Sequence, residues 1–490
     1  MSTDGRRLDA CFNPRRIAVV GASERGMYPA GILQNLLDNG YPGEIYPINP
    51  ARTTVFGLPC YAELNAAPQR ADLAIIVVPR RAVLPALGQC LELGVPAAVI
   101  ITAGFAEADD EGRRLQADMS RLIKDSSLTV VGPNCAGLAN IPGQVIATRL
   151  GPKGTPPPRP GPVSFVSQSG ALMMAVTGLF ADRQIGMNRL LSLGNQVDVT
   201  LEEALDYLAA DTETGVVGAF AEGVNDGRAL VNALRRLLLA GRPLVMIKSG
   251  RTPAGQRAAA THTAALAGSD RVFEAVCRQW GVVRVDDVRE LLDTIAVMAA
   301  FGHRLDGAGR LAIVTQSGGL GSLSADLCEL AGLQLPSLSE RTQSALRAMP
   351  PFAGLHGEGT RLYNPTDVQG AAVIGAATAE TLAPFLDDDS TDAVLLLLAK
   401  SSVREEDGPT AEAIIAAARC SPKPLLVVWT GQRYPHGDTV WPLAHRMLVE
   451  AGIPLFDQPS DCIRALARAT RYWRFRSAWL DDPEHIDAGA

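Results

Sequence analysis

The sequence predicts an α/β protein made of doubly wound parallel sheets. Short β-branched runs alternate with amphipathic stretches along most of the 490 residues, and such alternation is typical of parallel sheets covered by helices on both faces. Three regions each begin with a strand, a glycine-containing turn and a helix. Because one hydrophobic core stops growing near ~250–300 residues, we expect about three domains.

The first domain is expected over residues 8–148. A helix follows its first strand at residues 32–37. The predicted strands are short apolar runs at residues 16–21, 44–48, 73–78, 97–102 and 128–131. Runs that are apolar at nearly every position indicate strands that are buried on both faces of a sheet.

Two breaks in the chain separate the three domains. Residues 151–161 contain five prolines, which cannot lie inside a helix or a central strand. A second break is expected at residues 302–309, where a long apolar helix gives way to polar residues and glycines. The second domain is therefore expected over residues 160–302 and the third over residues 308–475, followed by a polar tail.

The second and third domains resemble each other at their starts. Residues 163–172 (VSFVSQSGAL) and residues 311–320 (LAIVTQSGGL) each have the pattern of a strand, a hydroxyl-Gln-Ser-Gly turn and the beginning of a helix. Both copies open regions of similar length, so we interpret them as a duplicated α/β subdomain rather than as chance similarity of one turn.

Composition limits the partners and the compartment. A net charge of −7 argues against a broad nucleic-acid surface, because phosphate binding needs clustered cations. No run approaches the ~18–20 apolar residues of a membrane span, and the polar start shows no secretory signal. Eight scattered cysteines and six dispersed histidines favour a reducing cytoplasm and no metal site.

The first strand ends in a glycine turn that suits an anion. Gly21, Ala22 and Ser23 precede a helix, whose N-terminal N–H groups attract negative charge. Ser23 occupies the second glycine position of the dinucleotide fingerprint, and Arg52 follows the second strand, where an NAD-binding protein has a carboxylate. We therefore favour a turn that binds a phosphorylated, nucleotide-like ligand over a turn with a purely structural role. The same two residues argue against an NAD-dependent oxidoreductase. Asn49 lies in the same loop as Arg52.

Three further strands of this domain end in loops that could touch the same ligand. The loops contain Val78 and Pro79, Thr102 and Ala103, and Asn134. In open α/β sheets, ligands bind at the carboxyl edge, where such loops meet. The neighbouring Cys135 has no local histidine that could act as its base, so we interpret it as a packing residue.

A second candidate anion site is the turn at residues 167–170, which consists of Ser167, Gln168, Ser169 and Gly170. Its hydroxyl and N–H groups open a helix at residue 171. A phosphate-binding role is favoured over a simple helix cap, and Ser169 does not fit the G-x-S-x-G pattern of a nucleophilic serine.

His262 is the candidate for covalent chemistry. Small residues surround it, so the backbone could come close to a charged group, and Thr263 adds a hydroxyl. An imidazole can attack phosphorus to form a phosphohistidine if an acceptor holds its other ring nitrogen. Glu222 ends another strand of the same domain and is the candidate acceptor, although an ordinary surface carboxylate would explain it equally well.

As a set, these residues resemble the NDP-forming acyl-CoA synthetases, a family that includes the succinyl-CoA synthetase α subunit. The resemblance to the α part of ADP-forming acetate–CoA ligases runs from Asn13 to about Trp473. The matching motifs are residues 20–23, 48–50, 72–79, 101–105 with Glu107, 132–135, 167–172, Gly194 and Asn195 with Asp198, 222–223, 248–251, 262–263 and 364–367.

The resemblance implies a CoA-binding Rossmann-like domain followed by two flavodoxin-like α/β subdomains. It also implies that a carboxylic acid and phosphate form an acyl phosphate, that the CoA thiol displaces phosphate, and that His262 carries the phosphoryl group to or from a nucleotide, with Glu222 as its partner. The implied phosphate-binding residues are Ser167, Gln168, Ser169, Gly170 and Thr263. The implied CoA-binding residues are Gly21, Ala22, Ser23, Asn49, Arg52, Val78, Pro79, Thr102, Ala103 and Asn134.

A partner chain is implied as well. The family's ATP-grasp domain has no counterpart in these residues, so ATP or ADP with Mg²⁺ is expected on a separate ATP-grasp β subunit within an oligomer. Two departures from the family pattern are Ala264, where glycine usually follows His-Thr, and Ala51, where lysine often follows Asn-Pro. The alternative function is a CoA-binding or acyl-CoA-binding regulatory or scaffold protein without ligase activity.

Overall fold

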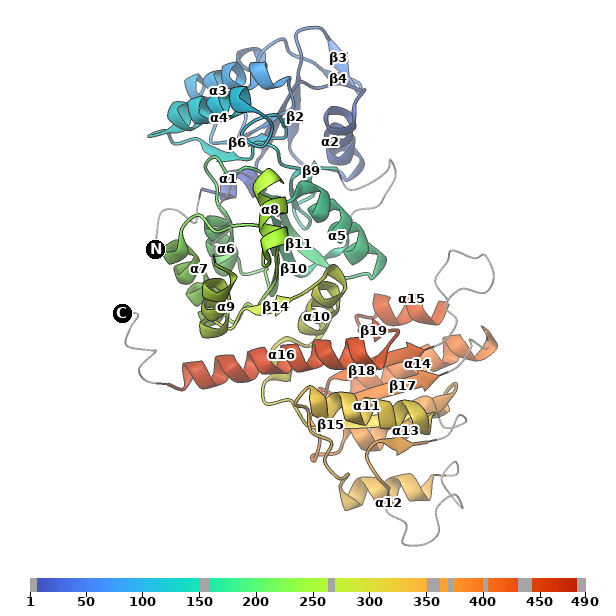
Figure 1. The fold of residues 1–490 in the computed structure, drawn as a ribbon. Helices are drawn as coiled ribbons and strands as arrows, with labels where there is room; N and C mark the ends of the chain where they lie inside the picture. The colour runs from blue at the N-terminus through green and yellow to red at the C-terminus, as the bar shows by residue number, and fades with distance from the viewer. Residues whose placement is uncertain are drawn as a thin grey trace. The chain divides into compact units, whose positions relative to one another are not determined.

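The computed structural model describes residues 7–149, 158–262, 269–349, 362–368, 373–399, 404–430 and 443–482, with backbone alone at residues 259–262 and 404–406. The chain divides into two compact units, Met1–Leu291 and Leu292–Ala490. The first unit contains two large sheets and the second contains one (Figure 1). Within the described residues, no helix combines the length and the apolar character needed to cross a membrane.

The first sheet is parallel, and its strand order corresponds to the doubly wound order 2-1-3-4-5. Its strands, from edge to edge, are β2 (Glu44–Ile48), β1 (Arg16–Val20), β5 (Leu73–Ile76), β6 (Ala97–Ile100) and β7 (Thr129–Val131). A small hairpin, β3 (Thr54–Val55) and β4 (Leu58–Pro59), follows β2. The helices of this part are α1 (Asp9–Phe12), α2 (Met27–Asp38), α3 (Val83–Glu92) and α4 (Asp110–Ile123).

Successive residues of β1 pack into two different cores, because side chains alternate across a strand. Ala18 and Val20 pack into a core that includes residues of α3 and α4. Ile17 and Val19 pack into a second core with α2, and this core continues into the helices that cover the second sheet. The first two sheets therefore share one continuous hydrophobic core.

The second sheet joins five parallel strands to an antiparallel hairpin. Its strands, from edge to edge, are β14 (Val283–Val285), β13 (Leu244–Lys248), β12 (Val216–Ala221), β10 (Pro160–Ser167), β11 (Met187–Ser192), β8 (Gly137–Asn140) and β9 (Val145–Thr148). The hairpin lies inside the expected first domain, 8–148, whereas β8 pairs with β11 of the second sheet. The accompanying helices are α5 (Gly170–Asp182), α6 (Leu201–Ala210), α7 (Gly227–Leu239), α8 (Pro253–His262) and α9 (Asp270–Gln279). The next helix, α10 (Val288–Phe301), contains the boundary between the two units.

The third sheet, in the second unit, repeats the order of the five parallel strands of the second sheet. Its strands are β16 (Thr366–Asp367), β15 (Leu311–Thr315), β17 (Ala393–Ala399), β18 (Leu425–Thr430) and β19 (Leu455–Phe456). Its helices are α11 (Gly318–Leu330), α12 (Glu340–Ala348), α13 (Ala377–Leu386), α14 (Arg404–Cys420), α15 (Leu443–Glu450) and α16 (Pro459–Leu480). The predicted α/β fold class, with two similar subdomains after the first, is confirmed.

Candidate functional site

The carboxyl ends of β1 and β5 form the switch point of the first sheet, where ligands bind in doubly wound folds. Gly21 follows β1 with a φ of +91°. A Cβ atom at this position would lie 2.2 Å from the carbonyl oxygen of Val77. Only glycine therefore allows the two loops to come this close.

Hydrogen bonds join the predicted ligand loops along this edge. Asn49 Nδ2 donates to the carbonyl oxygen of Ala22 (2.8 Å). Thr102 Oγ1 donates to the carbonyl oxygen of Val78 (2.7 Å), and Asn134 N donates to the carbonyl oxygen of Thr102 (3.0 Å). The structure thus brings together loops that are separated by up to about a hundred residues in the chain.

The remaining predicted residues of this edge are Ser23, Arg52, Pro79 and Ala103. Ser23 Oγ accepts a hydrogen bond from Arg25 N (3.0 Å). The side chains of Arg52 and Ala103 are exposed. An exposed guanidinium, such as that of Arg52, can turn toward a phosphate and bind it through two parallel N–H groups.

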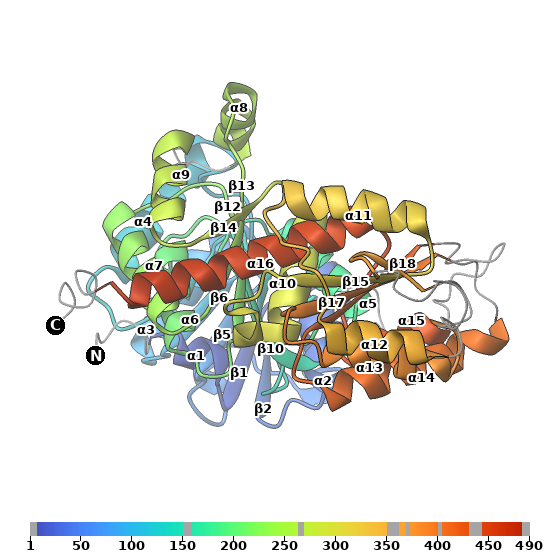
Figure 2. The same cartoon turned by 90° about the horizontal axis from the view of Figure 1, so that it is seen from below.

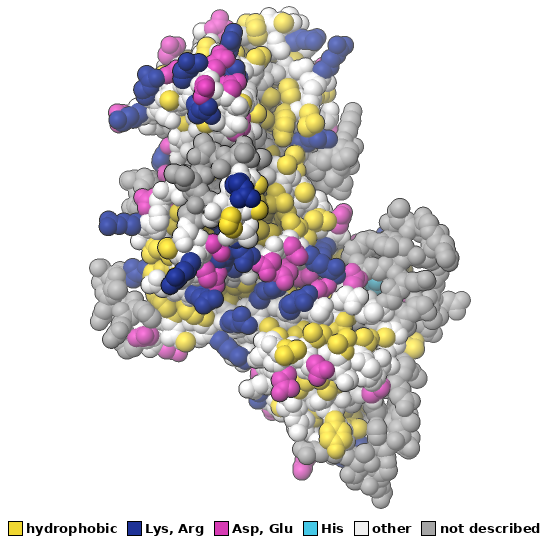
Figure 3. All heavy atoms as spheres, in the orientation of Figure 1, with side chains coloured by type: hydrophobic (Ala, Val, Ile, Leu, Met, Phe, Trp, Pro, Cys, Tyr) yellow, Lys and Arg dark blue, Asp and Glu magenta, His cyan; other side chains and the backbone are white. Residues whose placement is uncertain are grey.

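Arg80 stabilises the loop beside Ala103, a role that the sequence did not indicate. Its guanidinium donates to the carbonyl oxygen of Gly104 (2.9 Å) and forms ion pairs with Asp109 (2.9 Å) and Glu111 (2.6 Å). The partners lie 24 to 31 residues away in the chain, so no local pattern points to them. Positive and negative side chains are interspersed over α4 and the turn that precedes α3 (Figure 3), which leaves no broad basic patch on that part of the surface.

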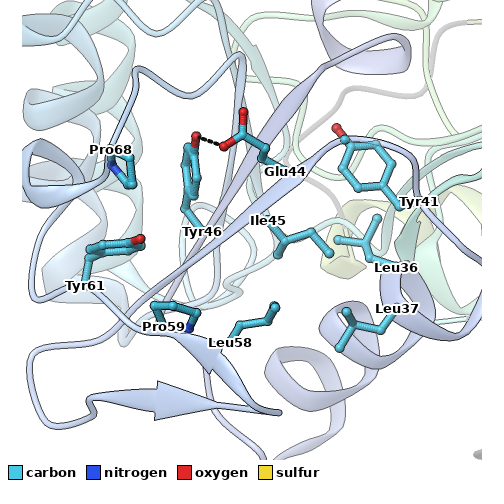
Figure 4. Close-up of a pocket in the computed structure, with 11 residues that line it drawn as sticks. Leu36, Leu37, Tyr41, Glu44, Ile45, Tyr46, Leu58, Pro59, Tyr61 and Pro68 are labelled. Carbon is cyan, nitrogen blue, oxygen red and sulfur yellow. Dashed lines mark hydrogen bonds between the residues drawn. The ribbon is translucent and has the colours of Figure 1, made fainter.

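A hollow of about 370 Å³ lies along the outer edge of β2, away from the predicted ligand loops (Figure 4). None of the predicted site residues lines it. Its walls include Leu36, Ile45 and Tyr61, and the Tyr46 hydroxyl donates to Glu44 Oε2 (2.7 Å) at its rim. An apolar hollow with a carboxylate beside it is a poor site for a phosphorylated ligand.

The turn at residues 167–170 lies at the carboxyl end of β10 and begins α5. Ser167 Oγ donates to the carbonyl oxygen of Ser169 (2.6 Å) and accepts from Ser169 N (3.1 Å). Ser169 caps the helix, since its Oγ accepts from Leu172 N (3.4 Å). The turn therefore serves as a helix cap and also presents the positive end of a 13-residue helix, which favours an anion.

Gln168 joins this turn to Glu222. Its Nε2 donates to the carbonyl oxygen of Gly223 (2.9 Å), and its Oε1 accepts from the N–H groups of Glu222 and Gly223. Lys248 Nζ donates to the carbonyl oxygen of Glu222 (2.8 Å), and burial lowers the pKa of Lys248 although the Asp270 carboxylate opposes the shift. Gln168, Glu222 and Lys248 are all buried, so the structure places Glu222 beside the predicted phosphate turn.

Replacing Gln168 by alanine should lower the free energy of unfolding by about 2–4 kcal/mol, because the buried N–H groups of Glu222 and Gly223 lose their acceptor. Urea-induced unfolding measures this loss. Gln316→Ala is the matched control: it occupies the equivalent turn, and its side-chain oxygen has no hydrogen-bond partner among the described residues. Equal losses for the two variants would contradict the assigned role of Gln168.

The equivalent turn of the second unit has the same internal hydrogen bonds. Thr315 Oγ1 donates to the carbonyl oxygen of Ser317 (3.0 Å) and accepts from Ser317 N (3.0 Å). Ser317 Oγ accepts from Leu320 N (3.4 Å) and caps α11. This identity, bond for bond, supports the predicted duplication.

The predicted phosphohistidine is the last residue of α8, and its side chain and Thr263 lie outside the described residues. The proposed pairing of His262 with Glu222 therefore stays a prediction. The described side chains of α8, at residues 253–258, are exposed or half-exposed. In Figure 2 this helix stands out beyond β13, at the carboxyl end of the second sheet.

The loop at residues 132–137 contacts both candidate sites. Asn134 belongs to the edge of the first sheet, whereas Ala136 lies against the turn that begins α5. A Cβ atom on Gly170 would lie 3.0 Å from the Ala136 Cβ, and Ala136 N donates to Ser192 Oγ (2.9 Å). Only Cys135 separates the residue at the predicted ligand edge from the residue at the predicted phosphate turn.

Cys135 lies between these two residues and is buried. Burial raises its thiol pKa to about 12, so it is a poor nucleophile. The interpretation of Cys135 as a packing residue agrees with this environment.

Two family models match the chain. The model described as CoA binding domain matches residues 15–141, and the one described as Succinyl-CoA ligase like flavodoxin domain matches residues 160–298. Among solved structures, "Ca. Korarchaeum cryptofilum dinucleotide forming Acetyl-coenzyme A synthetase 1 in complex with phosphate and ADP" is 30% identical, with a TM-score of 0.84 over 99% of each chain.

Curated relatives match the chain nearly from end to end. The α subunit of acetate–CoA ligase [ADP-forming] II of Pyrococcus furiosus is 33% identical over 94% of this chain and 96% of that subunit. The α subunit of acetate–CoA ligase [ADP-forming] I of the same organism is 30% identical over 96% of this chain and 98% of that subunit. Acetate–CoA ligase [ADP-forming] I of Archaeoglobus fulgidus is 33% identical over 95% of this chain, which spans 64% of that protein.

Proposed function

The chain belongs to the family of ADP-forming acyl-CoA ligases, and from this premise we propose that it is the CoA-binding α subunit of such an enzyme. The predicted family resemblance is confirmed by these relatives. The proposed substrates are CoA, a small carboxylic acid and phosphate. A protein that binds CoA or acyl-CoA for regulation, without ligase activity, is the competing proposal.

In the proposed reaction, the CoA thiol attacks the carbonyl carbon of an acyl phosphate. The carbon–sulfur bond forms, the carbon–oxygen bond to phosphate breaks, and the thiol proton leaves to solvent or phosphate. In the same direction, the acyl phosphate forms when a carboxylate oxygen attacks the phosphorus of phosphorylated His262 and displaces the imidazole. The N–H groups at residues 167–170 would stabilise the phosphate oxygens as charge develops on them.

One observation carries this proposal: the loop at residues 132–137 borders both sites. A thioester bound along the edge at Asn134 would have its reacting end close to the turn that begins at Ser167. Acyl transfer needs the two reacting atoms to be held about 3–3.5 Å apart. A protein that only senses CoA would not need an anion-binding turn beside the carboxyl edge of the first sheet, where CoA is proposed to bind (the CoA edge).

We propose further that the nucleotide and its Mg²⁺ bind on a separate ATP-grasp β subunit. The relatives that are themselves named α subunits support this, because the chain covers 96% and 98% of their lengths. The complete ligase would then be an oligomer of both kinds of chain.

The half-reaction assigned to this chain can be tested without nucleotide. The purified chain, given acetyl-CoA and inorganic phosphate, should release CoA thiol and form acetyl phosphate in equal amounts. Calorimetry should show binding of CoA but not of NADH. CoA binding without any phosphate-dependent thiol release, from acetyl-CoA or other short acyl-CoAs and with or without an ATP-grasp subunit, would overturn the proposal in favour of the regulatory alternative.

Glu222→Gln should slow phosphorylation of His262 by acyl phosphate about 10–100-fold, because a neutral amide stabilises a developing imidazolium less than a carboxylate does. CoA affinity should not change, since Glu222 lies beside the phosphate turn and not on the CoA edge. Phosphate-specific mass spectrometry measures the first quantity and calorimetry the second. The exposed Glu213→Gln serves as control, and identical kinetics for both variants would remove Glu222 from the site.

A further inference from the structure

Asn195 lies at the centre of a hydrogen-bond network between the first two domains. Its Nδ2 donates to Glu107 Oε2 (2.5 Å) and to Gln116 Oε1 (2.9 Å), so both amide hydrogens have acceptors in the first domain. Its Oδ1 accepts from Asn134 Nδ2 (3.3 Å), and its backbone N–H donates to the carbonyl oxygen of Pro133 (2.8 Å). One side chain of the second domain thus contacts two different loops of the proposed CoA edge.

Glu107 extends this contact to the loop that contains Thr102 and Ala103. Its Oε1 accepts from Gly104 N (2.6 Å), and both of its oxygens accept from Phe105 N (3.2 Å). Burial alone would raise the pKa of Glu107, but the hydrogen bonds from Asn195 and from these backbone groups lower it. The carboxylate therefore stays ionised, and hydrogen bonds to an ionised acceptor are stronger than those between neutral groups.

The backbone around Asn195 continues directly to the phosphate turn. Leu193 N donates to the carbonyl oxygen of Ser167 (2.9 Å), and Val197 N donates to the carbonyl oxygen of Gly132 (2.9 Å). Gly194 has a φ of +58°, and a Cβ atom there would lie 2.2 Å from the carbonyl oxygen of Pro133. The segment at residues 193–197 therefore contacts both the phosphate turn and the loop that contains Asn134.

We propose that Asn195, acting through Glu107, is a positioning residue. It holds the loops of the proposed CoA site, at residues 102–105 and 132–137, in a fixed position relative to the phosphate turn. This inference rests on the proposed function of the site. The side-chain nitrogen and oxygen of Asn195 are both used in hydrogen bonds to protein groups, so the role assigned to it needs no contact with either substrate. Its effect is geometric, and a misplacement of reacting groups by 1 Å can slow a reaction about 100-fold.

This role predicts that loss of the Asn195 side chain slows acyl transfer but leaves the affinity for CoA nearly unchanged. In Asn195→Ala, phosphorolysis of acetyl-CoA should slow about 30–100-fold, whereas the Kd for CoA should change less than about threefold. CoA binding should persist because Thr102 and Asn134 remain joined by their own hydrogen bond. The exposed Asn65→Ala is the matched control and should retain wild-type values for both quantities.

A paired substitution separates positioning from simple structural support. Asn195→Asp alone should be the slowest variant, because it sets a second carboxylate against Glu107. Adding Glu107→Gln to it restores a donor and an acceptor with their roles exchanged, and the double variant should recover at least about tenfold in rate. A double variant no faster than Asn195→Asp, or a rate for Asn195→Ala within threefold of wild type, would overturn the inference.

Hydrogen exchange gives a test that does not depend on turnover. In Asn195→Ala, the amides of residues 102–105 and of residues 193–197 should both lose protection, while those of β12 keep it. Unchanged protection at residues 102–105 would overturn the proposed linkage. If the wild-type chain releases no CoA from short acyl-CoAs in the presence of phosphate, with or without an ATP-grasp subunit, the proposed function fails. The exchange result then still decides whether Asn195 links the two domains.

Discussion

Replacing His262 by alanine should abolish ATP-linked ligation and leave phosphate-dependent release of CoA within about threefold of the wild-type rate. In the proposed reaction the two activities separate, because the acyl group moves between phosphate and CoA without a covalent bond to the protein. Phosphoryl transfer from ATP, by contrast, is proposed to pass through the His262 imidazole, which becomes phosphorylated. Loss of a covalent nucleophile lowers such a rate by about 10⁴-fold or more.

The measurement uses the chain together with an ATP-grasp subunit. Ligation is followed as acyl-CoA formed from acid, CoA and ATP, and the half-reaction as thiol released from acetyl-CoA by phosphate. His303→Ala, an exposed histidine of the second unit, is the control and should behave as wild type in both. Retention of ligation by His262→Ala would remove the phosphohistidine step, and parallel loss of both activities would place His262 in acyl transfer instead.

The strands of the first sheet were predictable because each is an almost uninterrupted apolar run. The expected strands at residues 73–78 and 97–102 correspond to β5 and β6, whose residues are all buried. The start of α2 was less predictable. This helix begins at Met27, with Pro29 in its first turn, whereas the expected helix began at residue 32. Proline is tolerated in the first turn of a helix, where its missing N–H has no intrahelical partner to lose.

The assignment of the hairpin β8–β9 to a sheet could not be predicted in the same way. Alternation and turn residues indicate that a strand forms, but they do not indicate which neighbour it pairs with. The hairpin precedes the proline-rich segment in the chain, yet β8 pairs antiparallel with β11. This pairing is what brings the loop with Asn134 and Ala136 against the phosphate turn.

The candidate residues at strand ends were predictable from topology. Glu107 and Asn195 were named only as parts of the family motifs, and the contact between them was not predictable. Gly21, Thr102 and Asn134 follow strands whose carboxyl ends must meet at one edge of a parallel sheet. Asn195 and Glu107 are 88 residues apart and lie in different domains. Their contact depends on how two domains pack, and no local pattern in the sequence carries that information.

Gly21→Ala should lower CoA affinity by at least about 100-fold, equivalent to about 2.7 kcal/mol of binding free energy. The new methyl group would meet the carbonyl oxygen of Val77 at 2.2 Å, and a φ of +91° is strained for any residue with a side chain. Because this oxygen belongs to the backbone, it cannot move away by a change of side-chain rotamer. The ends of β1 and β5 must therefore separate. That movement widens the switch point where CoA is proposed to bind.

The same strain should lower the free energy of unfolding by about 3 kcal/mol. Calorimetric titration with CoA measures the change in affinity, and unfolding over a series of urea concentrations measures the change in the free energy of unfolding. Gly88→Ala is the matched control: Gly88 lies in α3 of the same domain with nothing within 4 Å of an added Cβ. It should keep CoA affinity and gain about 0.5–1 kcal/mol, since alanine favours a helix over glycine. Wild-type CoA affinity in a folded Gly21→Ala variant would show that CoA does not bind at the carboxyl ends of β1 and β5.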